Sequence, residues 1–265
     1  MHIRWSVAIC KSSCRFWRAC KPVFSSLLFG AEEVARRTEL ENRARLLFMN
    51  ETLKRKHFYL TEKWYTRLAI LVSPTVAAAG VAPNHVTILN IVNGLVICGL
   101  ILMRQYWIAA FLIQLYLFLD VLDGNLARYR QMSSRLGAAL DNIGDRFFYN
   151  AVMIAVGIVV GNHWGWMVFF LVAHNLHAAL ATYYIVPRIK RLENFKRFRI
   201  KQALMDRGYI LGMDLSSQDL LLSVLLITPW RALIVPVVGV LYLVDLLFRL
   251  WELRLNHHAS ALCNG

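Results

Sequence analysis

Apolar residues are concentrated in six stretches between residues 86 and 250, and short polar connections separate them. The stretches lie at roughly 86–103, 107–127, 138–161, 165–186, 215–229 and 231–250. A helix that crosses a bilayer needs about twenty apolar residues, so this pattern predicts an all-α integral membrane protein with six transmembrane helices. The fifth stretch is short and ends at Thr228-Pro229, which makes its limits the least defined.

The residues that precede these stretches follow a different pattern. Through Gly30, basic residues alternate with aromatic ones, and from Ala31 to about Ile70 apolar positions recur at helical spacing between arginines and lysines. This pattern is typical of amphipathic helices that lie along the membrane interface, and a solvated helical hairpin is the alternative. We therefore expect a basic N-terminal segment over 1–72, a membrane domain over 73–252 and a cytosolic tail over 253–265.

Composition and charge agree with a membrane protein. Hydrophobic residues make up 58% of the chain and charged residues only 17%, whereas about a quarter of a soluble domain is charged. The chain has 30 basic and 16 acidic residues, a net charge of +14, which suits an anionic membrane face. Because the sequence contains no nucleic-acid-binding motif, we expect membrane lipids and no nucleic acid as partners.

Basic residues also predict the orientation of the chain. Eight of them lie between residues 188 and 207, whereas the connections near 105, 162 and 230 contain only Arg104 and Arg231. Since basic loops stay on the cytosolic side, we expect both termini and the aspartates described next to be cytosolic. Cys10, Cys14 and Cys20 lack the paired spacing of a zinc site, and a short chain with reduced thiols suits a bacterial inner membrane.

Four aspartates lie at the ends of the second and third apolar stretches. Asp120 and Asp123 are three residues apart, and Asp141 and Asp145 are four apart, so each pair lies on one face of its helix. A carboxylate inside a membrane is costly unless it is compensated, which favours a functional site over polar helix packing or an ion path. Oxygen ligands without histidine or cysteine suit Mg²⁺ or Mn²⁺ together with substrate phosphate oxygens.

Small residues and one arginine accompany these acids. Gly124, Ala127 and Gly137 are small where a membrane helix usually has bulky side chains, so a ligand or another backbone could approach closely. Arg128 follows at the end of its helix, where its planar guanidinium could meet a phosphate. The sequence therefore predicts a phosphate-containing ligand beside the acids.

The stretch from Asp120 to Asp145 resembles the signature D-x2-D-G-x2-A-R-x8-G-x3-D-x3-D of the CDP-alcohol phosphotransferases at all eight fixed positions. The resemblance implies a membrane enzyme that transfers a phosphatidyl group from CDP-diacylglycerol to the hydroxyl of a polar alcohol and releases CMP. It also implies a pair of Mg²⁺ or Mn²⁺ ions and, as in many family members, a homodimer. Two other functions stay open: transfer of a phospho-alcohol from a CDP-alcohol to diacylglycerol, and ion-coupled transport through the aspartates.

The resemblance assigns roles to individual residues. It implies that Asp120, Asp123 and Asp141 bind the metal ions and that Asp145 is either a ligand of the second ion or the base that takes the acceptor's proton. The residues implied to line the CDP pocket are Gly124, Ala127, Arg128 and Gly137, joined by Asn84 and Thr87 from a PN-x-x-T opening of the first helix that also resembles the family. A simple helix cap is the alternative for this opening.

The acceptor alcohol is not identified by these motifs. Arg188, Lys190 and Arg191 could recognise a phosphorylated alcohol, and basic charge beside anionic lipid is the alternative.

Further polar residues lie inside the apolar stretches. We expect His174, Asn175 and His177 to mediate helix or subunit packing rather than to bind metal, because no third ligand lies near them in the sequence. Asn90 and Asn93 could form interhelical hydrogen bonds or contact substrate. We also expect Asp245 to pair with Arg249 four residues later, and Ser216 or Ser217 to cap the fifth helix with Asp219 in its first turn.

Overall fold

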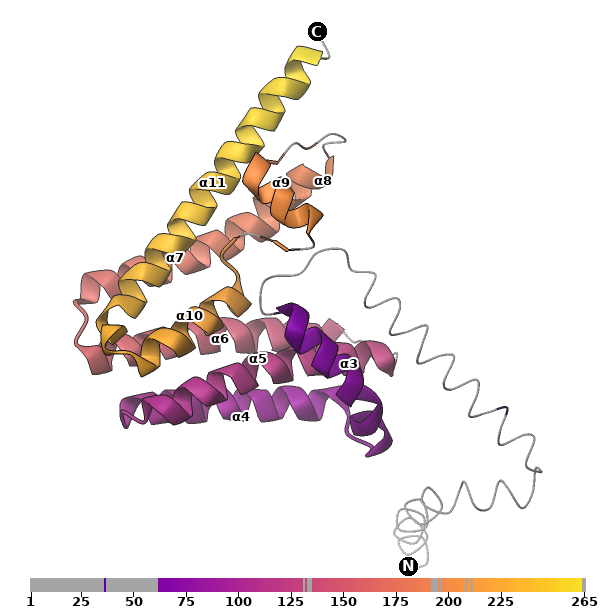
Figure 1. The fold of residues 1–265 in the computed structure, drawn as a ribbon, viewed down its shortest axis with the longest axis vertical. Coiled ribbons are helices and arrows are strands. Elements are labelled where there is room, and N and C mark those ends of the chain that lie inside the picture. Colours follow the sequence, from indigo (N-terminus) through magenta and orange to yellow (C-terminus); the bar gives the residue numbers. More distant parts are fainter. Residues whose placement is uncertain are drawn as a thin grey trace, which may run out of the picture. The chain divides into compact units, whose positions relative to one another are not determined.

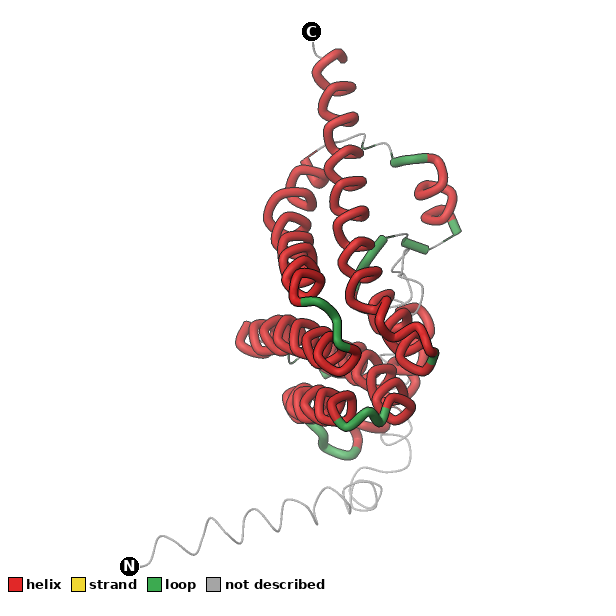
Figure 2. Tube along the Cα trace, turned by 90° about the vertical axis from the view of Figure 1, so that its left-hand side faces the viewer, coloured by secondary structure: helices red, strands yellow, loops and turns green. Residues whose placement is uncertain are grey.

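The computed structural model describes residues 36, 62–130, 132, 135–191, 195, 197–207, 209–210 and 212–263. The chain divides into two units, Met1–Arg55 and Lys56–Gly265, and the fold below is that of the second unit. The amphipathic helices expected before residue 62 lie outside the described residues, apart from Arg36. Among the described residues every element is a helix (Figures 1 and 2).

The helices follow one another with short connections. They are α3 (Glu62–Ala78), α4 (Pro83–Leu102), α5 (Tyr106–Tyr129), α6 (Arg135–Val160), α7 (Trp164–Leu180), the π-helix η1 (Ala181–Ile185), α8 (Val186–Arg191), α9 (Arg199–Asp206), α10 (Leu215–Ile227), the 3₁₀-helix η2 (Pro229–Leu233) and α11 (Ile234–Cys263). Helix α3 continues through residue 72, where the sequence placed the start of the membrane domain.

Five of these helical segments are long and apolar enough to cross a membrane: Pro83–Leu102, Tyr106–Tyr129, Asp141–Val160, Trp164–Arg191 and Arg231–Asn256. The expected sixth span is not confirmed, because α10 has only 13 residues. At 1.5 Å per residue it is about 20 Å long, shorter than a hydrocarbon layer of about 30 Å.

The limits of α10 have identifiable causes. The carboxylate of Asp214 accepts hydrogen bonds from the backbone N–H groups of Ser216 and Ser217, at 3.3 and 3.0 Å, and so caps its first turn. The prediction that Ser216 or Ser217 is the cap was therefore wrong. Asp219 lies one turn further along than expected, where it is fully buried and accepts a 2.8 Å hydrogen bond from the Tyr149 hydroxyl. Pro229 follows the last turn and starts η2.

Three exposed tryptophans lie at the starts of helices that begin at one end of the bundle. Trp107, Trp164 and Trp230 are 71%, 70% and 63% exposed, and each lies at the start of a helix, in α5, α7 and η2. Tryptophan is enriched where a membrane meets water, so this end of the bundle fits one membrane interface. Asp120 lies about 20 Å along α5 from Trp107 at 1.5 Å per residue, just past the middle of this 24-residue helix.

The helices pack in two groups. Helices α4, α5 and α6 lie side by side, α3 and α10 pack against α5, and α7 packs along α11 (Figures 1 and 2). The buried apolar side chains between them include Ile113, Val152, Leu222 and Val238. This packing brings α5, α6, α7, α10 and α11 around the residues of the candidate site.

Gln114 joins three of these helices. Its amide nitrogen donates to the Ser223 hydroxyl at 2.7 Å and to the Asp219 carbonyl at 3.0 Å, while its amide oxygen accepts a 2.7 Å bond from the Tyr65 hydroxyl. Since Tyr65 belongs to α3 and Ser223 to α10, both helices are fixed to α5 at the same residue.

An ion pair holds α9 against α11. The Lys201 ammonium lies 3.4 Å from one carboxylate oxygen of Glu252, and the backbone N–H of Phe198 donates to the other at 3.0 Å. Both charged side chains are buried. Burial lowers the pKa of Lys201, and the neighbouring Glu252 opposes this change.

Candidate active site

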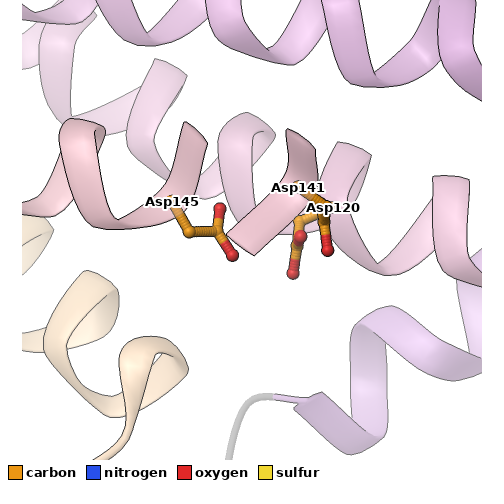
Figure 3. A group of neighbouring side chains, drawn as sticks. All are labelled: Asp120, Asp141 and Asp145. Carbon is orange, nitrogen blue, oxygen red and sulfur yellow. The ribbon is translucent and has the colours of Figure 1, made fainter. Parts of the chain in front are cut away.

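The structure brings three of the four motif aspartates together. Asp120 comes from α5, and Asp141 and Asp145 come from consecutive turns of α6. Each offers one carboxylate oxygen, and these oxygens lie within 4.8 Å of one another. Figure 3 shows the three side chains beside one another, with Asp141 and Asp120 closely grouped.

Asp123, the fourth predicted ligand, has a different environment. One of its carboxylate oxygens accepts a 2.8 Å hydrogen bond from the Thr87 hydroxyl of α4. The side chain of Asp123 is buried and lines a cavity that Asp141 also lines. Asp123 therefore lies next to the three-aspartate cluster without being one of the grouped oxygens.

The cluster formed by Asp120, Asp141 and Asp145 fits a divalent cation. Among the ion pairs of the described residues, none involves these three carboxylates. Carboxylates this close repel one another, and oxygen-only ligands are those that Mg²⁺ and Mn²⁺ prefer. A bound cation would thus offset the repulsion among the three carboxylates, which no ion pair of the described residues offsets.

A cavity of about 280 Å³ lies on one side of the cluster. Its lining includes all six residues that the sequence assigned to the nucleotide, namely Asn84, Thr87, Gly124, Ala127, Arg128 and Gly137. Ala82 occupies the N-cap position of α4 and Pro83 begins the helix, so Asn84 is not itself the cap residue.

The space beside Gly124 in this cavity is not filled by other protein atoms. A Cβ atom at this position would come no closer than 3.8 Å to another side chain, the guanidinium of Arg128. Such a distance is ordinary contact, so packing of the protein does not require a glycine here. Close approach of a ligand would require it.

A larger cavity of about 740 Å³ is lined by Asp145 of the cluster. It also receives three basic side chains from separate helical segments: Arg146, Lys190 and Arg249. The sequence singled out Lys190 but missed Arg146 and Arg249 as cavity residues. For Arg146, the available signal was a charged residue directly after Asp145 inside an apolar stretch.

The π-helix η1 shapes this cavity. A π-turn inserts an extra residue into a helix and is frequent at functional sites. Ala181 and Thr182 of η1 line the cavity, as do Val186 and Pro187 just beyond it. These side chains are short and so leave space in the cavity. Because proline has no backbone N–H group, Pro187 also leaves no donor without a partner where the helix changes its hydrogen-bond pattern.

Asp245 orders one wall of the larger cavity. Its carboxylate accepts a 2.6 Å bond from the Nε of Arg249, as the spacing of four predicted, and it lies 2.8 Å from the Nε2 of His177 on α7. Because Arg249 and His177 both line the cavity, one carboxylate fixes two nitrogen-bearing side chains there.

Several polar residues of the membrane helices make packing contacts, and His174 and His177 also line the larger cavity. The Asn175 amide donates to the Asn150 side chain at 3.0 Å, and the Asn93 amide donates to the Leu112 carbonyl at 3.2 Å. The ring of His174 stacks on Phe170 with centroids 5.4 Å apart. The single metal-ligand group found among the described residues is the aspartate cluster, so a metal role for these histidines has no support.

Comparisons with known proteins agree with the motif. The family model described as CDP-alcohol phosphatidyltransferase matches residues 80–251. The archaetidylinositol phosphate synthase of Pyrococcus horikoshii is 32% identical over 100 residues, which cover 38% of this chain and 52% of the relative. The match therefore spans about half the length of that relative.

Solved structures give a weaker likeness. The phosphatidylinositol phosphate synthase of Mycobacterium tuberculosis with CDP-DAG bound is 19% identical, with a TM-score of 0.49, and covers 71% of this chain and 94% of its own. The structure of the same protein in complex with manganese and citrate is 18% identical, with a TM-score of 0.48, and covers 69% and 87%. None of these comparisons supports the transporter alternative.

Proposed function

Because the chain belongs to the CDP-alcohol phosphatidyltransferase family, we propose that it transfers a phosphatidyl group from CDP-diacylglycerol to the hydroxyl of a polar alcohol and releases CMP. The observation that carries this proposal is that the aspartate cluster borders two cavities, with Asp141 lining the smaller and Asp145 the larger. Two substrates that entered the two cavities would meet at these acids.

The nucleotide belongs in the smaller cavity. Gly124, Ala127 and Gly137 leave room for it, and Asn84 and Thr87 supply polar groups from α4. Arg128 lines the same cavity, where its guanidinium would meet the pyrophosphate. Holding the pyrophosphate at the cluster would place the phosphorus to be attacked next to Asp145.

We assign the metal site to Asp120, Asp123, Asp141 and Asp145, which would hold a pair of Mg²⁺ or Mn²⁺ ions. Bound there, the cations would neutralise charge on the pyrophosphate and stabilise CMP as the leaving group. Asp145 faces the acceptor cavity, so it is the carboxylate placed to orient the attacking hydroxyl. As the new P–O bond forms and the bond to CMP breaks, Asp145 would take the hydroxyl proton.

The larger cavity favours an acceptor that itself carries a phosphate. An uncharged alcohol would not need Arg146, Lys190 and Arg249 in one cavity, whereas arginine and lysine are common phosphate ligands. An inositol phosphate would fit this charge, in line with the name of the Pyrococcus horikoshii relative. Arg188 is not among the cavity residues, since its guanidinium lies 3.5 Å from the Tyr184 ring centre.

The direct test is CMP release by the purified protein in detergent with CDP-diacylglycerol and Mg²⁺ or Mn²⁺. Acceptors would be compared in pairs, each alcohol with and without its phosphate, beginning with inositol. Asp141→Asn should abolish release, while Asp206→Asn, the same change at an exposed residue of α9, should leave it intact. If no acceptor supports CMP release and CDP-diacylglycerol does not bind, the proposed reaction is refuted.

Location and assembly complete the proposal. We place the protein in a bacterial inner membrane with the two cavities and both termini on the cytosolic side, because the basic residues of 188–207 follow α7 at that end. Labelling of single cysteines from either side of sealed vesicles would test this orientation. We also propose a homodimer, which the mass of the protein in detergent would confirm or refute.

A further inference from the structure

Asp145 is bound by a side chain outside the signature motif. The hydroxyl of Tyr116, which belongs to α5, donates a 2.9 Å hydrogen bond to one carboxylate oxygen of Asp145. Tyr116 is only 2% exposed, so water does not compete for this bond. The bond restricts rotation of the carboxylate and thereby fixes where its oxygens lie relative to Asp120 and Asp141.

The ring of Tyr116 is itself held in place by aromatic contacts. It stacks on Phe148 with centroids 3.8 Å apart and an angle of 19°, and it meets Tyr149 edge-on at 6.0 Å and 80°. Phe148 and Tyr149 follow Asp145 by three and four residues, so they project from the same face of α6. The tyrosine is thus positioned by the helix whose carboxylate it binds.

Gly94 of α4 completes this arrangement from a third helix. A Cβ atom at Gly94 would lie 2.9 Å from Cδ2 of Phe148 and 3.3 Å from Cε2 of Tyr116. The first distance is shorter than real Cβ contacts allow, so any other residue would push the stacked rings. Gly94 is buried and lines neither of the two cavities.

We infer that Tyr116 is a positioning residue for the metal site, and that Gly94 acts through the stacked rings to set its place. The inference rests on the proposed function, because it assumes that Asp145 binds a divalent cation. Hydrogen bonds from residues behind metal ligands orient those ligands, and their loss typically weakens metal affinity about 10- to 100-fold. Tyr116 would have this role for Asp145.

The test measures Mn²⁺ binding directly, from the electron paramagnetic resonance signal of free Mn²⁺ titrated into the purified protein in detergent. Tyr116→Phe removes a single oxygen and should weaken binding by about tenfold or more. Gly94→Ala keeps the hydroxyl but displaces the rings, and it should weaken binding as well. Tyr65→Phe is the matched control, because its hydroxyl binds the Gln114 amide at 2.7 Å and touches no acid.

The same titration of Asp120→Asn distinguishes a failure of the proposed metal site from a failure of the positioning role of Tyr116. If Asp120→Asn binds Mn²⁺ as the unaltered protein does, the proposed metal site is wrong and the inference falls with it. If Asp120→Asn loses binding while Tyr116→Phe and Gly94→Ala retain full affinity, the metal site stands and the positioning role alone is refuted.

Discussion

Gly124 gives a sharp test of where the nucleotide binds. In Gly124→Ala the new methyl group would meet no protein atom within 3.8 Å, so the substitution should not strain the folded state. Alanine is favoured over glycine in a helix by roughly 0.5–1 kcal/mol. The variant should therefore unfold at the same or a higher temperature than the unaltered protein.

The effect on activity should have the opposite direction. If CDP-diacylglycerol fills the space beside Gly124, the methyl group overpacks the 280 Å³ cavity. Overpacking typically costs about 1–3 kcal/mol, which corresponds to a loss of about 5- to 160-fold in kcat/KM for this substrate. The assay is CMP release at varied CDP-diacylglycerol and fixed acceptor, combined with thermal unfolding in the same detergent.

Gly99 of α4 supplies the control, because a Cβ atom there would have no neighbour within 4 Å and Gly99 does not line the cavity. Gly99→Ala should gain the same helix stability and keep full activity. A Gly124→Ala enzyme with unchanged kcat/KM would show that the nucleotide does not lie against Gly124. A variant that unfolds at lower temperature would show that the fold itself needs this glycine.

Two further substitutions test other parts of the structure. Arg249→Gln should raise the KM for a phosphorylated acceptor without changing the KM for CDP-diacylglycerol, since Arg249 lines only the larger cavity. Steady-state kinetics would measure both values. Equal effects on the two substrates would contradict the assignment of that cavity to the acceptor. Glu252→Gln should destabilise the protein by about 3 kcal/mol, the low end for a broken buried ion pair, because it leaves the buried Lys201 ammonium without its partner carboxylate. Thermal unfolding would measure this loss against Asp206→Asn, and equal stability of the two variants would show that the pair does not hold α9.

Long-range pairing explains what could not be predicted from the sequence. The starts of α4 and α5 were close to prediction, because apolar runs and the Pro83 signal are local. The aspartate cluster could also be predicted in part from the sequence, since helical spacing places Asp141 and Asp145 on one face of α6. The partner of Asp123, however, lies 36 residues earlier at Thr87, and that of Asp245 lies 68 residues earlier at His177. Neither spacing leaves a local signal.

The limits of α10 were close to prediction, 215–229 against the observed Leu215–Ile227, but its cap and its role as a span were not. The apolar run from 215 to 229 matches a membrane span in composition but not in length. Only the structure shows that Asp214 caps the helix. The larger cavity could not be predicted either, because Arg146, Lys190 and Arg249 come from helices that are distant in sequence.

The shortness of α10 bears on how a water-soluble compound and a lipid can react. Helix α10 starts about 20 Å from the end marked by Trp230, and Asp120 lies about as far from Trp107 along α5. Met213, Asp214 and Leu215 at that start line the larger cavity. Because α10 begins at this level, its first residues border the cavity next to Asp145, where a longer helix would continue past it. If the proposed function holds, a charged alcohol in this cavity would meet the lipid substrate without crossing the hydrocarbon layer.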